Sequence, residues 1–431
     1  MKNDINRDIG QIMYDWAKDI FPINRSITGK GVRDTLEYLK NLFPDLDIHK
    51  VSSGTKVFDW TIPDEWNIRD AYILNDQGEK VIDFQKNNLH VVGYSEPVNK
   101  SLDLADLNKN LYSLPDQPNA IPYVTSYYKR SWGFCLSENK RKSLADGKYQ
   151  VVIDSNLRPG VLNYGEIILP GLSKKEILIS TYICHPSMAN NEVSGPVVTI
   201  ALARWLQNLT NRRYTYRIIF IPETIGSITY LSKHLKHMKE VTDAGFVVTC
   251  VGDDRAYSFM PSRSGDTLSD RVALHVLNKH VSTYNQYDFL ERGSDERQYC
   301  SPLVDLPVSS IMRSKYGTYP EYHTSLDDLS FVSPKGLEGG FNIIKNCLLA
   351  LEVNYKYRAT NYCEPQLGKR GLYPTISTKE SGEEVAAMMN LIAYADGDKD
   401  LIEISDIIGE DIFDCANIAK ILEENGLLKK V

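Results

Sequence analysis

Three segments in the middle of the chain consist almost entirely of apolar and β-branched residues. They are EILISTYI (176–183), YRIIFIP (216–222) and GFVVTCVG (245–252). Runs of this length are typical of strands that are buried on both faces of a sheet. Apolar residues at helical spacing follow the first segment in 195–209 and the second in 227–238. This alternation predicts an α/β fold whose mainly parallel sheet is sandwiched by helices.

The segments on either side of this pattern predict further parts. From 57 to 123, short β-branched and aromatic runs alternate with turn signals such as NDQG, which indicates a small β-rich insertion. The segment 378–431 reads as helix, glycine turn, helix, glycine and short strand, the order of a winged helix-turn-helix. We therefore assign 1–56 and 124–377, which include two N-terminal helices, to the α/β domain.

Composition and charge narrow the function classes. The chain has 431 residues, a net charge of −7 and no apolar stretch long enough to cross a bilayer, so we expect neither a membrane nor a nucleic-acid partner. The segment 378–431 carries 13 acidic and 5 basic residues, and this charge opposes DNA binding. The start of the chain lacks the pattern of a secretory signal, and the seven cysteines are scattered without CxxC spacing. These features predict a cytoplasmic protein with reduced thiols.

Polar residues follow each of the three apolar strands, at the end where open parallel sheets bind ligands. The first strand is followed by His185, Asn191 and Glu192, the second by Glu223 and the third by Asp253. Later loops add GSDERQY (293–299) and EYHTSLDD (321–328), which contain Asp295, His323, Asp327 and Asp328. Imidazole and carboxylate groups together suit zinc.

The same residues also have structural interpretations. A single polar residue at a strand end is usually a cap or turn residue, and only their joint placement favours a metal site. Asp327 and Asp328 would cap the following helix or orient the His323 ring. The remaining helical histidines are expected on solvent-exposed faces: His234, His237, His275 and His280.

The ordered strings CHPSMANNEVSG, IFIPETIGS, VTCVGDD, GSDERQY and YHTSLDD resemble the zinc-dependent aminopeptidase and glutaminyl-cyclase-like exopeptidase superfamily. More closely, the chain is similar to a subgroup of bacterial proteins that have an aminopeptidase-like domain and a C-terminal winged helix. The strings FPINRSITGKGV and KRGLYPTIS extend this resemblance over nearly the whole chain.

The resemblance implies a zinc site. It assigns His185, Asp253 and His323 as ligands and Glu223 as the general base. Two positions depart from the superfamily pattern, because Asn191 stands where an aspartate bridges two zinc ions and Thr224 stands where a second glutamate binds metal. Two alternatives would supply a carboxylate ligand: Glu192 as a displaced carboxylate, or Glu223 as a metal ligand instead of the base. One zinc ion is therefore expected, and a second is left open.

Several functions remain open. The leading hypothesis is a metal-dependent, aminopeptidase-like hydrolase of a small peptide or amide substrate. Arg263, Arg313 and Tyr322 would contact a substrate carboxylate or oxyanion, and Asp295 a free amino group. The alternative is a catalytically altered binding or scaffold protein, prompted by Asn191 and Thr224. The subgroup's association with polysaccharide biosynthesis suggests a third possible reaction, the deacetylation of a sugar derivative. A homo-oligomer is left open.

Overall fold

The computed structural model describes residues 8–373 and 379–431. The chain divides into two compact units. The first comprises Met1–Ser269 and Tyr284–Asn342, and the second comprises Asp270–Thr283 and Ile343–Val431. The start of the predicted N-terminal helix and the predicted boundary after residue 377 lie outside the described residues.

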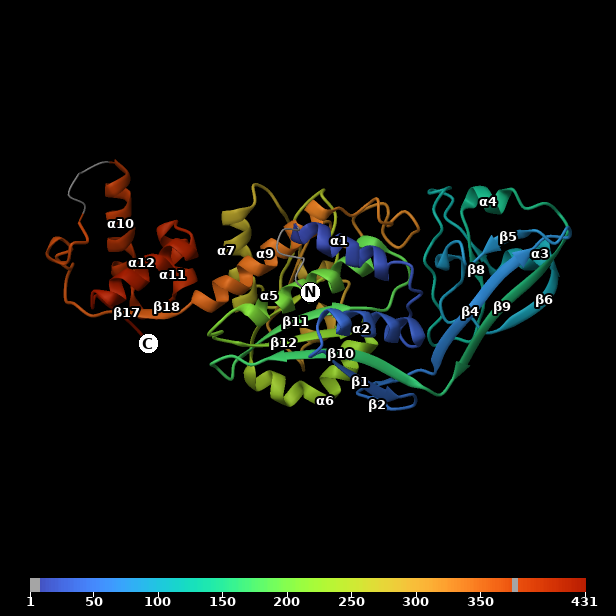
Figure 1. The fold of residues 1–431 in the computed structure, drawn as a ribbon, viewed down its shortest axis with the longest axis horizontal. Helices are drawn as coiled ribbons and strands as arrows, with labels where there is room; N and C mark the ends of the chain where they lie inside the picture. Colours follow the sequence, from blue (N-terminus) through green and yellow to red (C-terminus); the bar gives the residue numbers. More distant parts are fainter. Residues whose placement is uncertain (1–7, 374–378) are drawn as a thin grey trace. The chain divides into compact units, whose positions relative to one another are not determined.

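An eight-stranded mixed sheet forms the centre of the first unit (Figure 1). In spatial order its strands are β1 (Asp47–Ser52), β10 (Val161–Leu169), β12 (Thr215–Ile221), β11 (Glu176–Tyr182), β13 (Thr242–Val247), β16 (Val308–Met312), β14 (Ser258–Met260) and β15 (Asn285–Gln286). The four central strands β12, β11, β13 and β16 are parallel. Strand β10 pairs antiparallel with both β1 and β12, and β14 pairs antiparallel with β16 but parallel with β15. The predicted parallel sheet is therefore confirmed at its centre, and the whole sheet is mixed.

Helices cover both faces of this sheet. Helix α5 (Ser194–Asn208) connects β11 to β12, and α6 (Ile225–Val241) connects β12 to β13 on the other side of β11. Because such crossovers are right-handed, the two helices lie on opposite faces, as Figure 1 shows. Helix α1 (Ile9–Ile20) packs on α5, and α2 (Lys30–Leu42) packs on β10. All seven residues of β11 are consequently buried, in agreement with its continuous apolar sequence.

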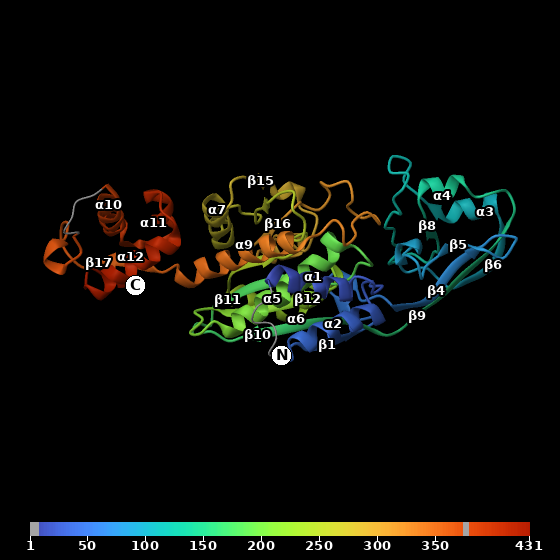
Figure 2. The same cartoon turned by 45° about the horizontal axis from the view of Figure 1, so that its top comes forward.

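A second, antiparallel sheet forms the β-rich part of the first unit (Figure 2). Its strands are β5 (Lys80–Asp83), β4 (Glu65–Leu74), β9 (Lys148–Arg158) and β6 (Val98–Asp103), in that order. Strand β9 follows the predicted insertion range of 57–123 but pairs with β4 along nearly its whole length. Smaller elements complete this part: the hairpin β2 (Lys56–Val57) and β3 (Trp60–Thr61), the pair β7 (Leu111–Tyr112) and β8 (Phe134–Cys135), and helices α3 (Leu104–Leu107) and α4 (Glu138–Lys142).

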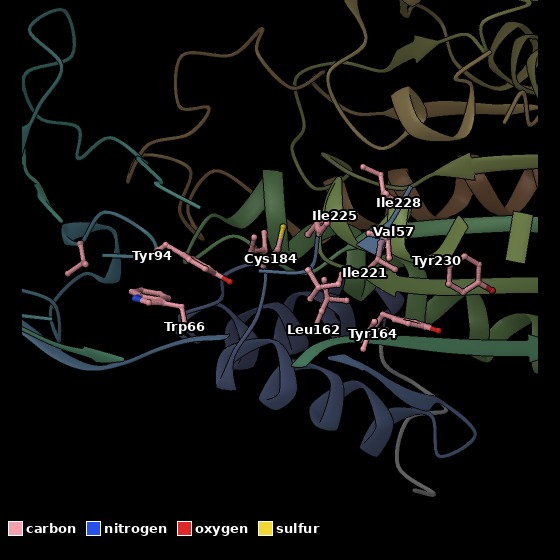
Figure 3. Close-up of a cluster of buried hydrophobic side chains, with 14 of the residues drawn as sticks. Val57, Trp66, Tyr94, Leu162, Tyr164, Cys184, Ile221, Ile225, Ile228 and Tyr230 are labelled. Carbon is pink, nitrogen blue, oxygen red and sulfur yellow. The ribbon is translucent and has the colours of Figure 1, made fainter. Parts of the chain in front are cut away.

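One apolar cluster joins the two sheets of the first unit (Figure 3). The rings of Trp66 and Tyr94, from the β-rich part, are stacked with centroids 5.8 Å apart. The same cluster contains Leu162 of β10 and Ile221 of β12. Cys184, which follows β11, belongs to it as well. The residues that follow the central strands are therefore held in a continuous core.

The C-terminal unit contains the predicted winged helix-turn-helix elements. Helix α11 (Leu401–Ile408) ends at Gly409, whose φ of 77° is the left-handed conformation that favours glycine at a helix end. Helix α12 (Ile412–Glu424) and β19 (Leu428–Lys430) follow. Strand β19 and β18 (Asp396–Asp400) flank β17 (Lys356–Ala359), and α10 (Lys379–Tyr394) packs on α11 and α12.

The expectation that His275 lies on a solvent-exposed face is wrong. This residue of α7 (Leu268–His280) is 1% exposed. Its Nδ1 lies 2.7 Å from Oδ1 of Asp406, and its Nε2 accepts a hydrogen bond of 3.0 Å from the backbone N–H of Ile412. The ring therefore links α7 to α11 and α12 within this unit. His237 does have an exposed side chain, at 52%.

The remaining helices are α8 (Glu296–Tyr299) in the first unit and α9 (Pro334–Val353), which runs from the first unit into the second. Over the described parts of the chain, no helix combines the length and the apolar character that a membrane crossing requires.

Candidate active site

The ends of β11 and β12 bring His185 and Glu223 together. The two strands are parallel neighbours, so the residues that follow them meet at the same edge of the sheet. Nε2 of His185 lies 3.6 Å from Oε2 of Glu223. The backbone N–H of Glu223 donates to Sγ of Cys184 over 3.2 Å, which ties the two strand ends to each other.

Glu192 orients the His185 ring. Its Oε2 lies 3.0 Å from Nδ1 of His185, so Nε2 is the nitrogen that faces Glu223. Burial lowers the pKa of His185, but the hydrogen bond and the charge of Glu192 outweigh burial and raise it overall. Glu192 stands on a π-helical turn (Ala189–Val193) before α5, a local geometry that is frequent at functional sites. Glu192, which was predicted as a metal ligand, thus contacts Nδ1 of His185, on the other side of the ring from Glu223.

Arg25 fixes the position of Glu192 in turn. Its Nε donates to Oε1 of Glu192 over 3.1 Å and to the backbone oxygen of His185 over 2.9 Å. The side chains of Arg25 and Glu192 are 1% and 0% exposed. Arg25 comes from the loop between α1 and α2, far from both partners in the sequence.

A cavity of about 430 Å³ opens beside His185 and Glu223. It is lined by Ile27, Trp60, Tyr123, Thr125, Tyr127, Tyr128, Cys184, His185, Glu223, Thr224, Ile225, Arg297 and His323. Burial raises the pKa of Glu223 against the opposing charges of His185 and Arg297. The cavity therefore combines an aromatic wall with a few charged and imidazole groups, the usual composition of a small-molecule site.

His323 reaches the same cavity from a distant loop. Its ring centroid lies 5.4 Å from that of His185, and the Tyr123 ring contacts both histidines at 5.2 and 5.1 Å. Tyr322 stacks on His323 at 3.9 Å. Burial, followed by the nearby His185, lowers the pKa of His323 to about 3. His323 is therefore neutral, and its buried Nε2 has no hydrogen-bond partner.

Asn191 also has a buried acceptor atom without a partner. Its Nδ2 donates to the Tyr182 hydroxyl over 2.9 Å, whereas its Oδ1 accepts nothing. The Asp327 carboxylate receives the backbone N–H groups of Asn190 and Asn191 over 2.6 and 2.9 Å. Asp327 thus caps the helical turn that carries Asn191, rather than the helix that follows it in the sequence.

Asp253 does not join the other predicted ligands. Its Oδ1 accepts from the backbone N–H of Arg255 and the Ser314 hydroxyl, and its Oδ2 accepts from the backbone N–H of Ser314 and from Asn190. All four contacts are 2.8–3.1 Å long. Strand β13 ends at Val247 rather than at 252. In this structure Asp253 fastens the loops around it.

The predicted substrate residues lie in different places. Arg263 pairs with Asp305 at the surface, and buried Arg313 donates to the backbone oxygen of Asp253. Asp295 lies behind Thr224, where its Oδ1 accepts from the backbone N–H of Thr224 and the Ser227 hydroxyl over 2.8 and 2.7 Å. Burial and the charge of Glu223 raise the pKa of Asp295 to about 7. None of these three residues lines the cavity, and Tyr322 acts on it through its stacking on His323.

The cavity is lined by two imidazole groups, His185 and His323, which are ligands that suit zinc. Nε2 of His323 and Oδ1 of Asn191, on the turn that also carries Glu192, are buried without a hydrogen-bond partner. Such unsatisfied acceptors are costly unless a ligand meets them. Asp253 and Thr224 stand where the family pattern has metal ligands, and in this structure hydrogen bonds engage both: Asp253 accepts from four donors and the Thr224 hydroxyl accepts from Arg297.

Another grouping of ligand atoms does not suit a metal. Among the described residues, Cys184, His185 and Glu192 are the ones that place three ligand atoms within 4.8 Å of one another. Burial raises the pKa of the Cys184 thiol well above its usual value. Nδ1 of His185 and the Glu192 carboxylate already bind each other, and Arg25 neutralises the carboxylate.

Three contributors to the site were not predicted from the sequence as site residues. Arg25 occurs within FPINRSITGKGV, one of the strings that carry the family resemblance, and Tyr123 ends the predicted β-rich insertion, but local pattern does not distinguish either from an ordinary loop residue. Arg297 belongs to the polar loop GSDERQY, but the sequence assigns it no role. Their positions depend on contacts between segments that are far apart in the chain.

Comparisons with known proteins agree with the fold. Residues 14–354 match a family described as a domain of unknown function (DUF4910), and residues 355–430 match a winged helix-turn-helix family. A Clostridium acetobutylicum protein, provisionally named as a polysaccharide biosynthesis protein with an aminopeptidase-like domain, is 45% identical over 400 residues. These residues make up 92% of this chain and 91% of that protein.

Solved structures give the same picture. A crystal structure of a provisionally named peptidase from Clostridium acetobutylicum has a TM-score of 0.93 and 43% identity, covering 98% of this chain and 96% of that chain. The zinc aminopeptidase of Bacillus subtilis has a TM-score of 0.57 at 12% identity, covering 80% and 94%. The resemblance to aminopeptidases is thus confirmed at the level of the fold, as is the C-terminal winged helix.

Proposed function

The chain belongs to the family described as a domain of unknown function (DUF4910), and on this premise we propose that it is a metal-dependent hydrolase of a peptide or amide bond. One observation carries the proposal. The 430 Å³ cavity brings a carboxylate, Glu223, within 3.6 Å of an oriented imidazole, His185, beside the unpartnered Nε2 of His323. The aminopeptidase-like fold supports the same reaction class.

His185, His323 and Asn191 would hold one zinc ion. When bound, the ion supplies Lewis acidity toward the substrate carbonyl. Glu192 and Arg25 keep Nε2 of His185 directed into the cavity, because they hold the other ring nitrogen and the backbone of the same residue. Asn191 is an uncharged ligand, so the site would hold its metal less tightly than an aspartate-containing site.

Glu223 is the general base in this proposal. Its carboxylate takes a proton from the attacking water as the new carbon–oxygen bond forms. The same carboxyl group then gives this proton to the amide nitrogen as the carbon–nitrogen bond breaks. The products are a carboxylic acid and an amine. The aromatic wall, which includes Trp60 and Tyr123, would exclude bulk water from this exchange.

A second candidate function is that of a binding or scaffold protein with the aminopeptidase fold. It is favoured by Thr224 and Asp253, which hydrogen bonds hold in structural roles. A relative's name links that protein to polysaccharide biosynthesis, and an amide-bearing sugar derivative is a ligand that both candidate functions share.

Metal analysis combined with an amide-hydrolysis screen separates the two candidates. We expect the purified full-length chain to bind one zinc ion and to release amines from small amides. His185→Ala and His323→Ala should lose the metal, whereas Glu223→Gln should keep it and lose at least about 100-fold in rate. His237→Ala, on an exposed helix face, is the control. Amide hydrolysis that does not depend on zinc in any of the variants, or full activity of Glu223→Gln, would overturn the hydrolase proposal.

A further inference from the structure

Arg297 is the cationic side chain that lines the candidate active-site cavity. Its guanidinium is held at two points by neutral groups. Nε donates to the backbone oxygen of Ser294 over 2.9 Å, and Nη2 donates to Oγ1 of Thr224 over 2.8 Å. Nη1 takes part in neither contact. The arginine is therefore fixed in place without having its charge neutralised by those partners.

No carboxylate of the described residues lies within ion-pair distance of Arg297. The adjacent acidic residues are engaged elsewhere. Oε1 of Glu296 accepts from two backbone N–H groups and from the Tyr316 hydroxyl over 2.6–2.9 Å. Asp295 accepts from the backbone of Thr224 and from Ser227. Glu223 lines the same cavity and feels the charge of Arg297, but no ion pair within 4.0 Å joins the two side chains. A fixed arginine that faces a cavity without a directly paired carboxylate is a recognition element for an anion.

Thr224 holds Arg297 in place through its hydroxyl group. Its φ of 63° is strained for a β-branched residue, and such strain persists only where the surroundings impose it. Asp295 receives its backbone N–H, and its hydroxyl receives Nη2 of Arg297. The strained conformation thus turns the hydroxyl toward the guanidinium. Thr224 stands where the family pattern has a metal-binding glutamate, so the positive charge of Arg297 lies next to that position.

We propose that Arg297 binds a carboxylate of the substrate, so that the substrate class is an amide that also carries a carboxylic acid, such as an N-acyl amino acid. The amide bond in this inference rests on the proposed function, whereas the substrate carboxylate is inferred from the cavity alone. For the opposite polarity, capture of a free amino group, the cavity offers the Glu223 carboxylate, which the proposed function already uses as the general base. Asp295, the predicted amine ligand, lies outside the cavity lining with its Oδ1 already bound by two donors.

Calorimetric binding to the full-length protein tests the proposal with three small probes. N-acetylglycine carries the carboxylate, N-acetylglycinamide replaces it with a neutral amide, and glycinamide carries a free amine. We expect N-acetylglycine to bind at least about tenfold more tightly than N-acetylglycinamide, because charge-assisted hydrogen bonds are the stronger ones. Glycinamide should bind most weakly.

Variants assign the preference to Arg297. Arg297→Gln should bring the ratio of the two acetylated probes close to one, and Arg297→Lys should retain part of the preference. Arg263→Gln, a surface arginine outside the cavity, should retain all of it. Metal content and thermal unfolding are measured for each variant, so that lost metal or lost fold is not taken for a lost anion site.

Three results would overturn the proposal: equal binding of both acetylated probes by the wild-type protein, tightest binding of glycinamide, or an unchanged ratio in folded Arg297→Gln. The proposed function fails separately. A protein that prefers N-acetylglycine through Arg297 but hydrolyses no amide retains the anion site and loses the hydrolase assignment. A protein that hydrolyses uncharged amides without any carboxylate preference retains the hydrolase assignment and loses the anion site.

Discussion

Arg25 and Glu192 form a buried ion pair, with Nε of Arg25 3.1 Å from Oε1 of Glu192 and both side chains at most 1% exposed. The pair joins the loop after α1 to the helical turn before α5. Because the second oxygen of Glu192 contacts His185, the same pair sets the orientation of the candidate metal ligand. Stability and site geometry are therefore coupled at this point.

Replacing Arg25 should strongly destabilise the first unit. Arg25→Met leaves Glu192 buried without its cationic partner, a change that costs on the order of 3–5 kcal/mol in comparable proteins. Denaturant unfolding followed by tryptophan fluorescence measures the loss, because all five tryptophans precede residue 206. Arg69→Met removes an exposed pair with Asp154 and should change the unfolding free energy little. Equal effects of the two substitutions would contradict the importance of burial.

Asn191→Asp should tighten metal binding without adding a second ion. A charged oxygen replaces the neutral amide oxygen, and we expect an affinity gain of about tenfold or more. The stoichiometry should remain one metal per chain, because Asp253 and Thr224 stay occupied by hydrogen bonds. Zinc titration against a competing chelator, with elemental analysis, measures both quantities. Two ions per chain in the variant would show that those contacts yield to a metal.

The stability of the first unit should depend on the ionisation of Glu65 in acid. Burial raises the pKa of Glu65, but hydrogen bonds from Arg33, Asn67 and the Val161 backbone outweigh burial and lower it to about 2. Since the folded value lies below the unfolded value of 4.5, ionised Glu65 stabilises the fold above about pH 4.5. This contribution is lost as the pH falls toward 2. After allowance for solvent screening it is on the order of 1 kcal/mol.

The difference in unfolding free energy between the wild-type protein and Glu65→Gln, followed from pH 6 to about pH 2.5, tests this assignment. The wild-type advantage should shrink as the pH falls. An advantage that is constant with pH would mean that the carboxylate charge at Glu65 contributes nothing.

His275→Ala should loosen the C-terminal unit. The substitution leaves the backbone N–H of Ile412 without its acceptor and removes the contact with Asp406, and we expect a cost of about 1–3 kcal/mol. Amide hydrogen exchange in α12 is the suitable measurement, because tryptophan fluorescence reports only on the first unit. The control is His280→Ala, whose side chain is 29% exposed and should matter less. Unchanged exchange in α12 would contradict the role of His275.

The sequence alone determined the main elements of the fold. The strands β11 and β12, helices α5 and α6, and the helix–glycine–helix order before β19 follow from apolar periodicity and glycine positions. These signals are local, so they can be read along the chain. The proximity of His185 and Glu223 could also be predicted, because neighbouring parallel strands end at one edge of the sheet.

Only the tertiary structure decided which polar side chains serve the cavity. The sequence predicts Asp253 directly after a strand, as it does His185, yet β13 ends at Val247 and four hydrogen-bond donors satisfy the Asp253 carboxylate outside the cavity lining. Glu192 contacts the far nitrogen of His185, while Arg25 and Arg297 reach the site from distant segments. The role of a buried polar atom depends on whether another segment satisfies it, and the packing of those segments settles that question.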